Sequence, residues 1–172
     1  MARALYAISR WLAVFGGLML FAMALLTAAS VVGRALFGKP IPGDFELVGI
    51  GTGIAVFAIL PWCQITRGNV LVDFFMSAAS VRAKAVCDAA GALLYLAIAC
   101  ILTWRLVLGG VDMYRYAERS MTIGFPRWTT FPVAVLLMVF LVAVIAWTLR
   151  RSIAEARANR TLPDAPGDER HP

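Results

Sequence analysis

Four long stretches of the chain contain no charged side chain. They lie between residues 10 and 34, 46 and 67, 88 and 105, and 127 and 150. A helix that crosses a lipid bilayer needs about 20 apolar residues. Three stretches reach this length directly, and the one after residue 88 does so when Arg105 reaches the membrane surface or faces a polar partner. The pattern predicts four membrane-spanning helices, at about residues 11–33, 47–66, 86–110 and 128–149.

The composition leads to the same fold class. Of the 172 residues, 61% are hydrophobic and 15% are charged, whereas ordinary domains have about 45–50% apolar residues. A soluble chain of this length could not hide so much apolar surface. We therefore predict an all-α integral membrane protein whose four transmembrane helices lie in residues 1–151. Residues 152–172 turn to proline, glycine and charge, which predicts a disordered cytoplasmic tail.

The segment between the second and third predicted spans, residues 67–84, mixes apolar and polar side chains. Read as a helix, it places Val72, Phe75, Met76 and Ala79 on one face, three and four positions apart. Such an amphipathic helix would lie flat in the cytoplasmic interface of the membrane. The alternative is an exposed connector that begins the third span early, and the sequence leaves both interpretations open.

The Lys and Arg residues predict the orientation of the chain. With the N-terminus inside, the cytoplasmic segments hold ten of the 16 Lys and Arg residues and the outer segments hold six. Cytoplasmic loops carry such an excess, so both termini are expected in the cytoplasm. The net charge of +6 is then attributed to this orientation and to anionic lipid headgroups. Because no basic run is interleaved with aromatic residues, we expect no nucleic-acid partner.

Few side chains offer catalytic or metal-binding chemistry. The single histidine, His171, lies in the predicted tail, which argues against axial ligation of a haem. Cys63, Cys87 and Cys100 form no C-x-x-C pair. No cluster of His, Cys and carboxylate residues suggests a metal site. We therefore predict no enzymatic activity, no metal and no cofactor.

The predicted spans also lack the polar interior of an ion-coupled carrier. Ionisable groups at membrane depth cost about 2.5–3.5 kcal/mol each on insertion scales, so they mark function. The first, second and fourth spans contain none, and Gln64 is the only strongly polar residue of the second. This pattern favours a helper subunit of a larger assembly. Gly49 and Gly53 form a GxxxG motif, which serves close helix packing either inside this chain or against another one.

Three groups of residues carry a resemblance to a known family. The first turn contributes Gly33, Arg34, Phe37, Pro40, Pro42, Glu46 and Leu47. The end of the second span and the segment after it contribute Leu60, Pro61, Gln64, Arg67, Gly68, Val70, Val72, Asp73 and Phe74, and the approach to the last span contributes Gly124, Pro126 and Trp128. In their order and spacing, these residues resemble the DctQ-like small membrane subunit of tripartite ATP-independent periplasmic (TRAP) transporters over residues 5–150. The family often has a histidine where this chain has Asn69.

The resemblance implies a function. The family's small permease subunit is not catalytic, has four helices and lies in the bacterial inner membrane. It assembles with a large permease subunit that carries substrate and sodium and moves as an elevator. A periplasmic solute-binding protein delivers the substrate, typically an organic acid. The resemblance implies that this chain scaffolds the large subunit during organic-acid uptake by symport. The alternative is a stand-alone exporter or channel, formed by self-assembly of this chain.

The turn between the first two spans raises a structural hypothesis. Arg34 and Glu46 flank it at the same outer depth, so they pair with each other, face the large subunit or remain in water. Pro40 and Pro42 fix φ and stiffen the turn, which would present a rigid surface to the large subunit or the binding protein. The alternative is an ordinary hairpin connection. The candidate assembly residues are Arg34, Pro40, Pro42, Glu46, Gly49, Gly53, Pro61, Gln64 and Asp73.

Overall fold

The computed structural model describes residues 2–66 and 81–158. These residues form four long helices and one short 3-10 helix, namely α1 (Ala2–Phe37), α2 (Asp44–Ile65), α4 (Val81–Arg115), η1 (Arg127–Thr129) and α5 (Thr130–Ala158). Each long helix contains a stretch long and apolar enough to cross a membrane. The prediction of an all-α membrane protein with four transmembrane helices is confirmed. The expected interfacial helix falls mostly outside the described residues, and α4 has already begun at Val81.

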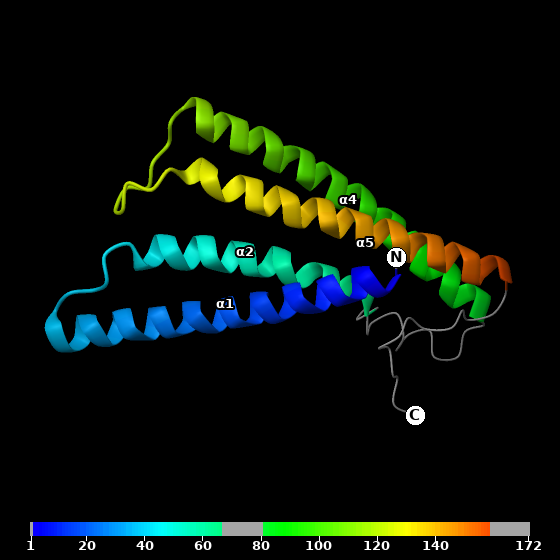
Figure 1. Cartoon of the computed structure of the whole chain (residues 1–172), viewed down its shortest axis with the longest axis horizontal. Coiled ribbons are helices and arrows are strands. Elements are labelled where there is room, and N and C mark those ends of the chain that lie inside the picture. Colours follow the sequence, from blue (N-terminus) through cyan, green and yellow to red (C-terminus); the bar gives the residue numbers. More distant parts are fainter. Residues whose placement is uncertain (1, 67–80, 159–172) are drawn as a thin grey trace.

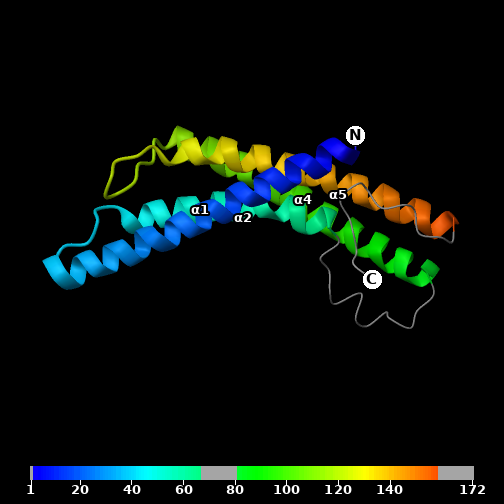
Figure 2. The ribbon, with the colours of Figure 1, turned by 60° about the horizontal axis from the view of Figure 1, so that its bottom comes forward.

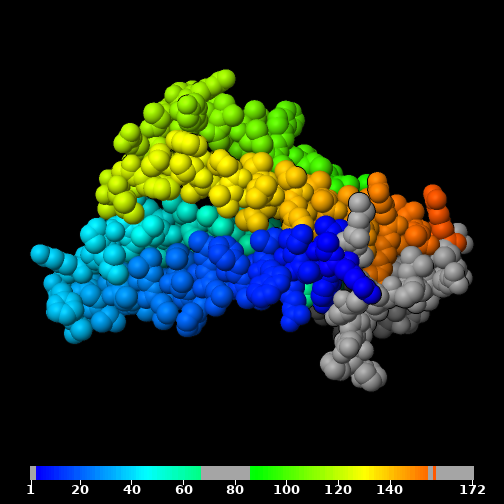
Figure 3. Space-filling view, viewed as in Figure 1, coloured from blue at the N-terminus to red at the C-terminus, as the bar shows by residue number. Residues whose placement is uncertain are grey.

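The four helices form two hairpins that pack side by side (Figure 1). α1 packs along α2, α4 packs along α5, and the hairpins meet through α2 and α5. The helices therefore form a row in the order α1, α2, α5, α4, which the space-filling view shows across one face (Figure 3). Along the helix axes, the N-terminus and the C-terminal end of α5 lie at the same end of the helix bundle, as a second view also shows (Figure 2).

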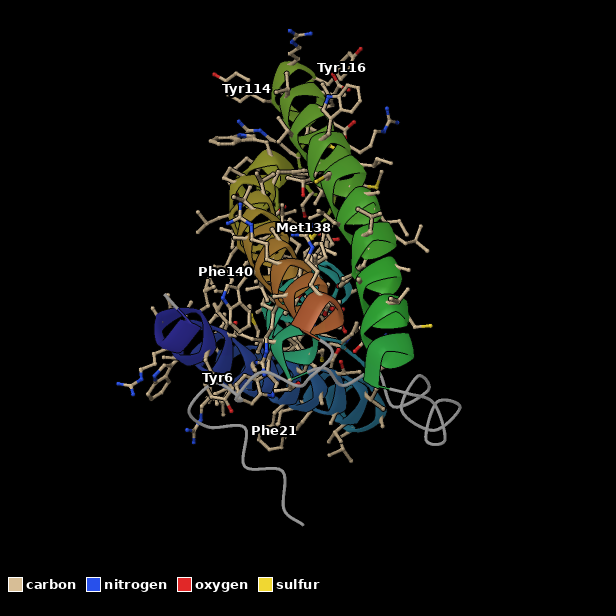
Figure 4. All side chains as sticks on the ribbon, turned by 90° about the vertical axis from the view of Figure 1, so that its right-hand side faces the viewer. Tyr6, Phe21, Tyr114, Tyr116, Met138 and Phe140 are labelled. Atoms are coloured by element: carbon tan, nitrogen blue, oxygen red, sulfur yellow. The ribbon has the colours of Figure 1, made fainter. Side chains whose placement is uncertain are left out.

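α2 and α5 form the centre of the row, and α1 and α4 form its edges. The most apolar window of α5 is 39% buried within the chain, whereas that of α1 is 6% buried. Met138 and Leu141 of α5 pack with Ala99 of α4, and Phe57 of α2 packs against this cluster. Phe21 of α1, in contrast, projects away from the other helices (Figure 4). The edge helices therefore leave long apolar faces that the described part of the chain does not cover.

α1 is longer than the predicted span 11–33 at both ends. Its 36 residues correspond to about 54 Å, against about 30 Å for the hydrocarbon core of a bilayer. No proline interrupts α1, and Gly38, with a φ of 68°, ends it. The chain then folds back over α1, so that a Cβ at Gly33 would lie 3.3 Å from the carbonyl oxygen of Lys39. α2 consequently begins beside Ser30 rather than beside Phe37.

α5 also continues beyond the predicted start of the tail at residue 152. It runs to Ala158, through the segment SIAEARA. Alanine, arginine and glutamate all favour helix, and Ser152 is buried. Residues 152–158 therefore extend the helix instead of beginning a disordered tail. The rest of the predicted tail, residues 159–172, lies outside the described residues.

Candidate functional site

The carboxylate of Glu46, in the first turn of α2, joins the two hairpins at the end of the bundle where α2 begins. It accepts hydrogen bonds from the Ser120 hydroxyl and from the backbone N–H groups of Met121 (3.0 Å) and Thr122 (3.4 Å). All three donors belong to the connection between α4 and η1. Hydrogen bonds to an ionised carboxylate are stronger than bonds between neutral groups. Glu46 therefore ties the first hairpin to the second.

The connection of residues 116–126 is folded so that it presents these donors. The Ser120 N–H donates to the Phe125 carbonyl at 2.8 Å, and the Gly124 N–H donates to the Ser120 carbonyl at 3.1 Å. Gly124 has a φ of 70°, in the left-handed region that favours glycine. Ser120 is buried. This tight turn fixes the N–H groups of residues 121 and 122 where one carboxylate can accept both, as in the anion-binding concavities of other backbone turns.

At the same end of the bundle, the connection between α1 and α2 also touches the connection between α4 and η1, at Gly43. This residue has a φ of 77°, and a Cβ placed on it would overlap the side chain of Ile123. Its backbone angle and its neighbour therefore both require glycine. We call the joint formed by Gly43, Glu46, Ser120 and Ile123 the loop clasp. It combines an apolar contact with charge-assisted hydrogen bonds across the two hairpins.

A separate set of contacts closes the turn between α1 and α2. The Ser30 hydroxyl donates to the Asp44 carboxylate and accepts a hydrogen bond from the Ile41 N–H at 3.3 Å. Arg34 lies near enough to interact electrostatically with Asp44. Ser30 is only 2% exposed. The start of α2 is thus held against α1 by Asp44.

These contacts correct the hypothesis that Arg34 pairs with Glu46. Within residues 2–66 and 81–158, Arg34 interacts with Asp44, whereas Glu46 is bonded to the connection at residues 120–122. Side chains two positions apart on a helix do not face the same side. Asp44 therefore faces α1 while Glu46 faces the second hairpin. Pro40 and Pro42 lie exposed in the turn.

A second polar contact joins the hairpins at the far end of α2. Gln64 Nε2 donates to Thr148 Oγ1 at 2.9 Å, and the Thr148 hydroxyl donates to the Ile145 carbonyl at 2.9 Å. About five turns, or roughly 27 Å, of α2 separate Glu46 from Gln64, so both lie on one face of the helix. This distance is close to the thickness of the hydrocarbon core, about 30 Å. One face of α2 is therefore bonded to the second hairpin at both ends of the span.

Glycine packs α1 against α2, but at a position outside the GxxxG motif. A Cβ at Gly16 would lie 2.8 Å from Ile59 Cγ1 and 2.9 Å from the Ala55 carbonyl oxygen. A Cβ at Gly49 or Gly53 would have no such neighbour within 4 Å. Of the two interpretations of the motif, close packing inside this chain therefore does not hold for the described residues.

The remaining candidates occupy different places. Pro61 is buried inside α2, next to Trp62, whose ring makes an edge contact with Tyr6 of α1 at 5.0 Å between centroids. Tyr6, near the start of α1, is labelled in Figure 4. Asp73 and Asn69 lie outside the described residues.

Sequence reasoning missed Ser120, Thr148 and Gly16. A signal existed for the first two, because Glu46 and Gln64 each need a hydrogen-bonding partner at the edge of an apolar span. Ser120 and Thr148 are polar residues at matching ends of the other hairpin. No signal separated Gly16 from the adjacent Gly17.

Comparison of the sequence with known protein families shows which family the chain belongs to. The family model described as "Tripartite ATP-independent periplasmic transporters, DctQ component" matches residues 23–155. The chain belongs to this family. No curated protein and no solved structure gives a match.

The match confirms the resemblance found in the sequence. Its range contains the loop clasp, Ser30, Gln64 and Thr148, so the contacts between the hairpins lie within the DctQ region. The DctQ-family chain is thus a multi-pass membrane component of a TRAP transporter. Its family is a transport component and not an enzyme family.

Proposed function

We propose that this DctQ-family chain is the small permease subunit that scaffolds the large, substrate- and sodium-carrying subunit of a TRAP transporter. The complex takes up an organic acid from the periplasm by sodium symport, after a periplasmic solute-binding protein delivers it. It lies in the bacterial inner membrane, with both termini of the small subunit in the cytoplasm and the loop clasp on the periplasmic side.

The bonding of α2 at both ends carries this proposal. Glu46 and Gln64 are the polar groups of α2 that face the second hairpin, and both are hydrogen-bonded within the chain. Their side chains hold helices together instead of lining a path for a solute. Polar contacts between helices stabilise membrane proteins by fixing one arrangement. A fixed packing of the helices suits a subunit that acts as a scaffold for a transport subunit that moves.

The apolar edges of the row supply surfaces for a partner in the membrane. The most apolar windows of α1 and α4 are 6% and 11% buried within the chain. Large side chains along α1, such as Phe15, Leu18 and Phe21, are 53–64% exposed. Lipid covers such surfaces in an isolated chain, and a partner helix covers them in a complex. The edges α1 and α4, rather than the α2–α5 interface, are therefore available to the large subunit.

Purification and reconstitution test the proposal. The tagged chain, isolated from its native membrane, is expected to carry with it a much larger hydrophobic chain. Liposomes containing both chains should take up an organic acid only when a sodium gradient and the binding protein are present. Liposomes with the small chain alone are the matched control. Uptake by that control would refute the scaffold function and support the self-assembling exporter or channel.

The orientation is tested with a reporter enzyme that is active only in the periplasm. Fusions after Lys39 or after Ser120 should be active, because both positions lie in connections on the proposed periplasmic side. Fusions after Asn69 or after Arg151 should be silent. Activity of the Arg151 fusion would contradict the proposed orientation of the four spans.

A further inference from the structure

Arg105 lies further from the ends of its span than any other charged residue in the described spans. The span runs from Val86 to Arg115, and residues 89–104 and 106–111 on either side of Arg105 carry no charge. Ionisable groups at membrane depth are costly and mark a functional role. Arg105 therefore needs an explanation that the contacts between the hairpins do not supply.

Packing between α4 and α5 shows the depth of Arg105. A Cβ at Gly110 would lie 2.9 Å from Phe131 Cβ, and Ala99 packs in the core cluster with Met138. The two helices are antiparallel, so Arg105, between Gly110 and Ala99, lies at the depth of the α5 segment between Phe131 and Met138. Arg105 is therefore level with the apolar part of the last span and not with its polar ends.

Arg105 has no partner among the described residues. Its side chain is exposed, and no hydrogen bond or ion pair joins it to another described residue. Asp88 and Asp112 are the carboxylates of α4, about 26 Å and about 10 Å away along the helix axis. Both distances exceed what an arginine side chain spans. The described part of the chain thus offers a cation at membrane depth without an anion beside it that would balance it.

Apart from Asp112, about two turns away, the side chains around Arg105 on its side of α4 are apolar. Leu94, Ile98, Ile101 and Leu108 lie on the same side at helical spacing, and each is 40–65% exposed. We call these four residues together with Arg105 the Arg105 face. A surface of this kind is suited to another apolar helix that carries one negative charge.

The direction of the Cα–Cβ bond favours a protein anion over a lipid phosphate as the partner of Arg105. In an α-helix the Cα–Cβ bonds tilt toward the N-terminus. Arg105 therefore leaves α4 pointing toward Val81, away from the nearer membrane surface beside Arg115. To reach a lipid headgroup there, the guanidinium would have to turn back along its own helix. A carboxylate on a neighbouring helix meets it without this reversal.

We propose that the Arg105 face docks a transmembrane helix of the large permease subunit, and that an Asp or Glu on that helix pairs with Arg105. The proposal rests on the scaffold function and specifies α4 as the edge of the row that holds the large subunit. A second copy of this chain does not fit, because its described spans carry no acidic side chain at this depth. The apolar neighbours of Arg105 would exclude water from the pair and so strengthen it.

The test compares Arg105→Leu with Arg115→Leu, which removes the same charge from the exposed last turn of the same helix. Each variant is co-expressed with the large subunit and isolated through a tag on the small subunit. Arg105→Leu should recover at least about tenfold less large subunit than the unmodified chain, because the partner carboxylate is left buried and unpaired. Arg105→Lys should recover part of it, and Arg115→Leu should match the unmodified chain. Equal amounts of each variant in the membrane show that insertion is unaffected.

Cross-linking provides a second readout in a chain that retains Arg105. A photoreactive residue in place of Ile101, on the Arg105 face, should form an adduct with the large subunit. The same residue in place of Val111, which is 42% exposed on another side of α4, should not. Arg105→Glu should abolish recovery, and replacing the partner carboxylate with Arg in the large subunit should restore it.

The outcomes separate this inference from the scaffold function. Full recovery of the large subunit by Arg105→Leu, or equal cross-linking from both positions, would overturn the pairing of Arg105 while the scaffold function stands. Loss of a bound anionic lipid from Arg105→Leu, with the two subunits still together, would also overturn it. An unmodified chain that recovers no large subunit would overturn the scaffold function and the pairing with it.

Discussion

The substitution Gly16→Ala tests how closely α1 approaches α2. A Cβ at Gly16 would lie 2.8 Å from Ile59 Cγ1 and 2.9 Å from the Ala55 carbonyl oxygen. The isoleucine side chain can change its rotamer, but the carbonyl oxygen belongs to the backbone and moves only with α2. We therefore expect the added methyl group to push the two helices apart. A Cβ at the adjacent Gly17 would have no neighbour within 4 Å.

Gly17→Ala is the matched control that isolates the cost of this overlap. Both substitutions add one methyl group, and both gain the same helix propensity of about 1 kcal/mol relative to glycine. Overpacking a well-packed contact costs about 1–3 kcal/mol. The helix-propensity gain cancels between the two variants, so Gly16→Ala should be about 1–3 kcal/mol less stable than Gly17→Ala.

Reversible unfolding of the purified chain measures this difference. The chain in mixed micelles is titrated with sodium dodecyl sulfate, and the loss of helix is followed by far-ultraviolet circular dichroism. The free energies of unfolding of the two variants are then compared at the same detergent composition. Equal stabilities would refute the reasoning, because they would show that Ala55 and Gly16 do not approach as closely as described.

Three further predictions concern the remaining contacts of α2. In a double-mutant cycle, Gln64→Leu and Thr148→Val should show a coupling free energy of about 0.6–1.7 kcal/mol; a coupling of zero in the same unfolding assay would contradict their bond. Glu46→Gln keeps the side-chain size but removes the charge, so a protease should cut the connection at residues 116–126 faster than in the unmodified chain. Cleavage at an unchanged rate would show that the carboxylate does not restrain it. Gly49→Ala and Gly53→Ala should leave the free energy of unfolding unchanged or raise it by up to about 1 kcal/mol, and a clear loss of stability would show that these glycines pack inside the chain.

The sequence by itself determined the number and type of the membrane-spanning elements. Hydrocarbon cannot solvate charges or unpaired backbone groups, and a helix needs about 20 apolar residues to cross it, so each long run without charge predicts a transmembrane helix. The family could also be recognised from the sequence, because its motifs follow the spans in a fixed order. The helix ends were less predictable. α1 runs on to Phe37 and α5 to Ala158, because nothing in the adjoining residues stops a helix where the membrane ends.

Only the tertiary structure decided which residues join the helices. The sequence suggests Arg34 and Glu46 as partners because both flank the first turn. In the structure, Glu46 is bonded to Ser120, 74 positions away. A sequence pattern gives the distance of a residue along its helix, but the partner also depends on how the helix is rotated against its neighbours.

The adjacent glycines of α1 show the same division. Gly16 and Gly17 are equivalent in the sequence, yet a Cβ on one would meet α2 and a Cβ on the other would meet nothing. A helix turns by about 100° per residue, and nearly all side chains around them are apolar. In lipid, apolar side chains face both the membrane and the neighbouring helix, so the polarity that reveals the inner face of a soluble helix is missing. The buried face of α1 could therefore be identified only from its packing.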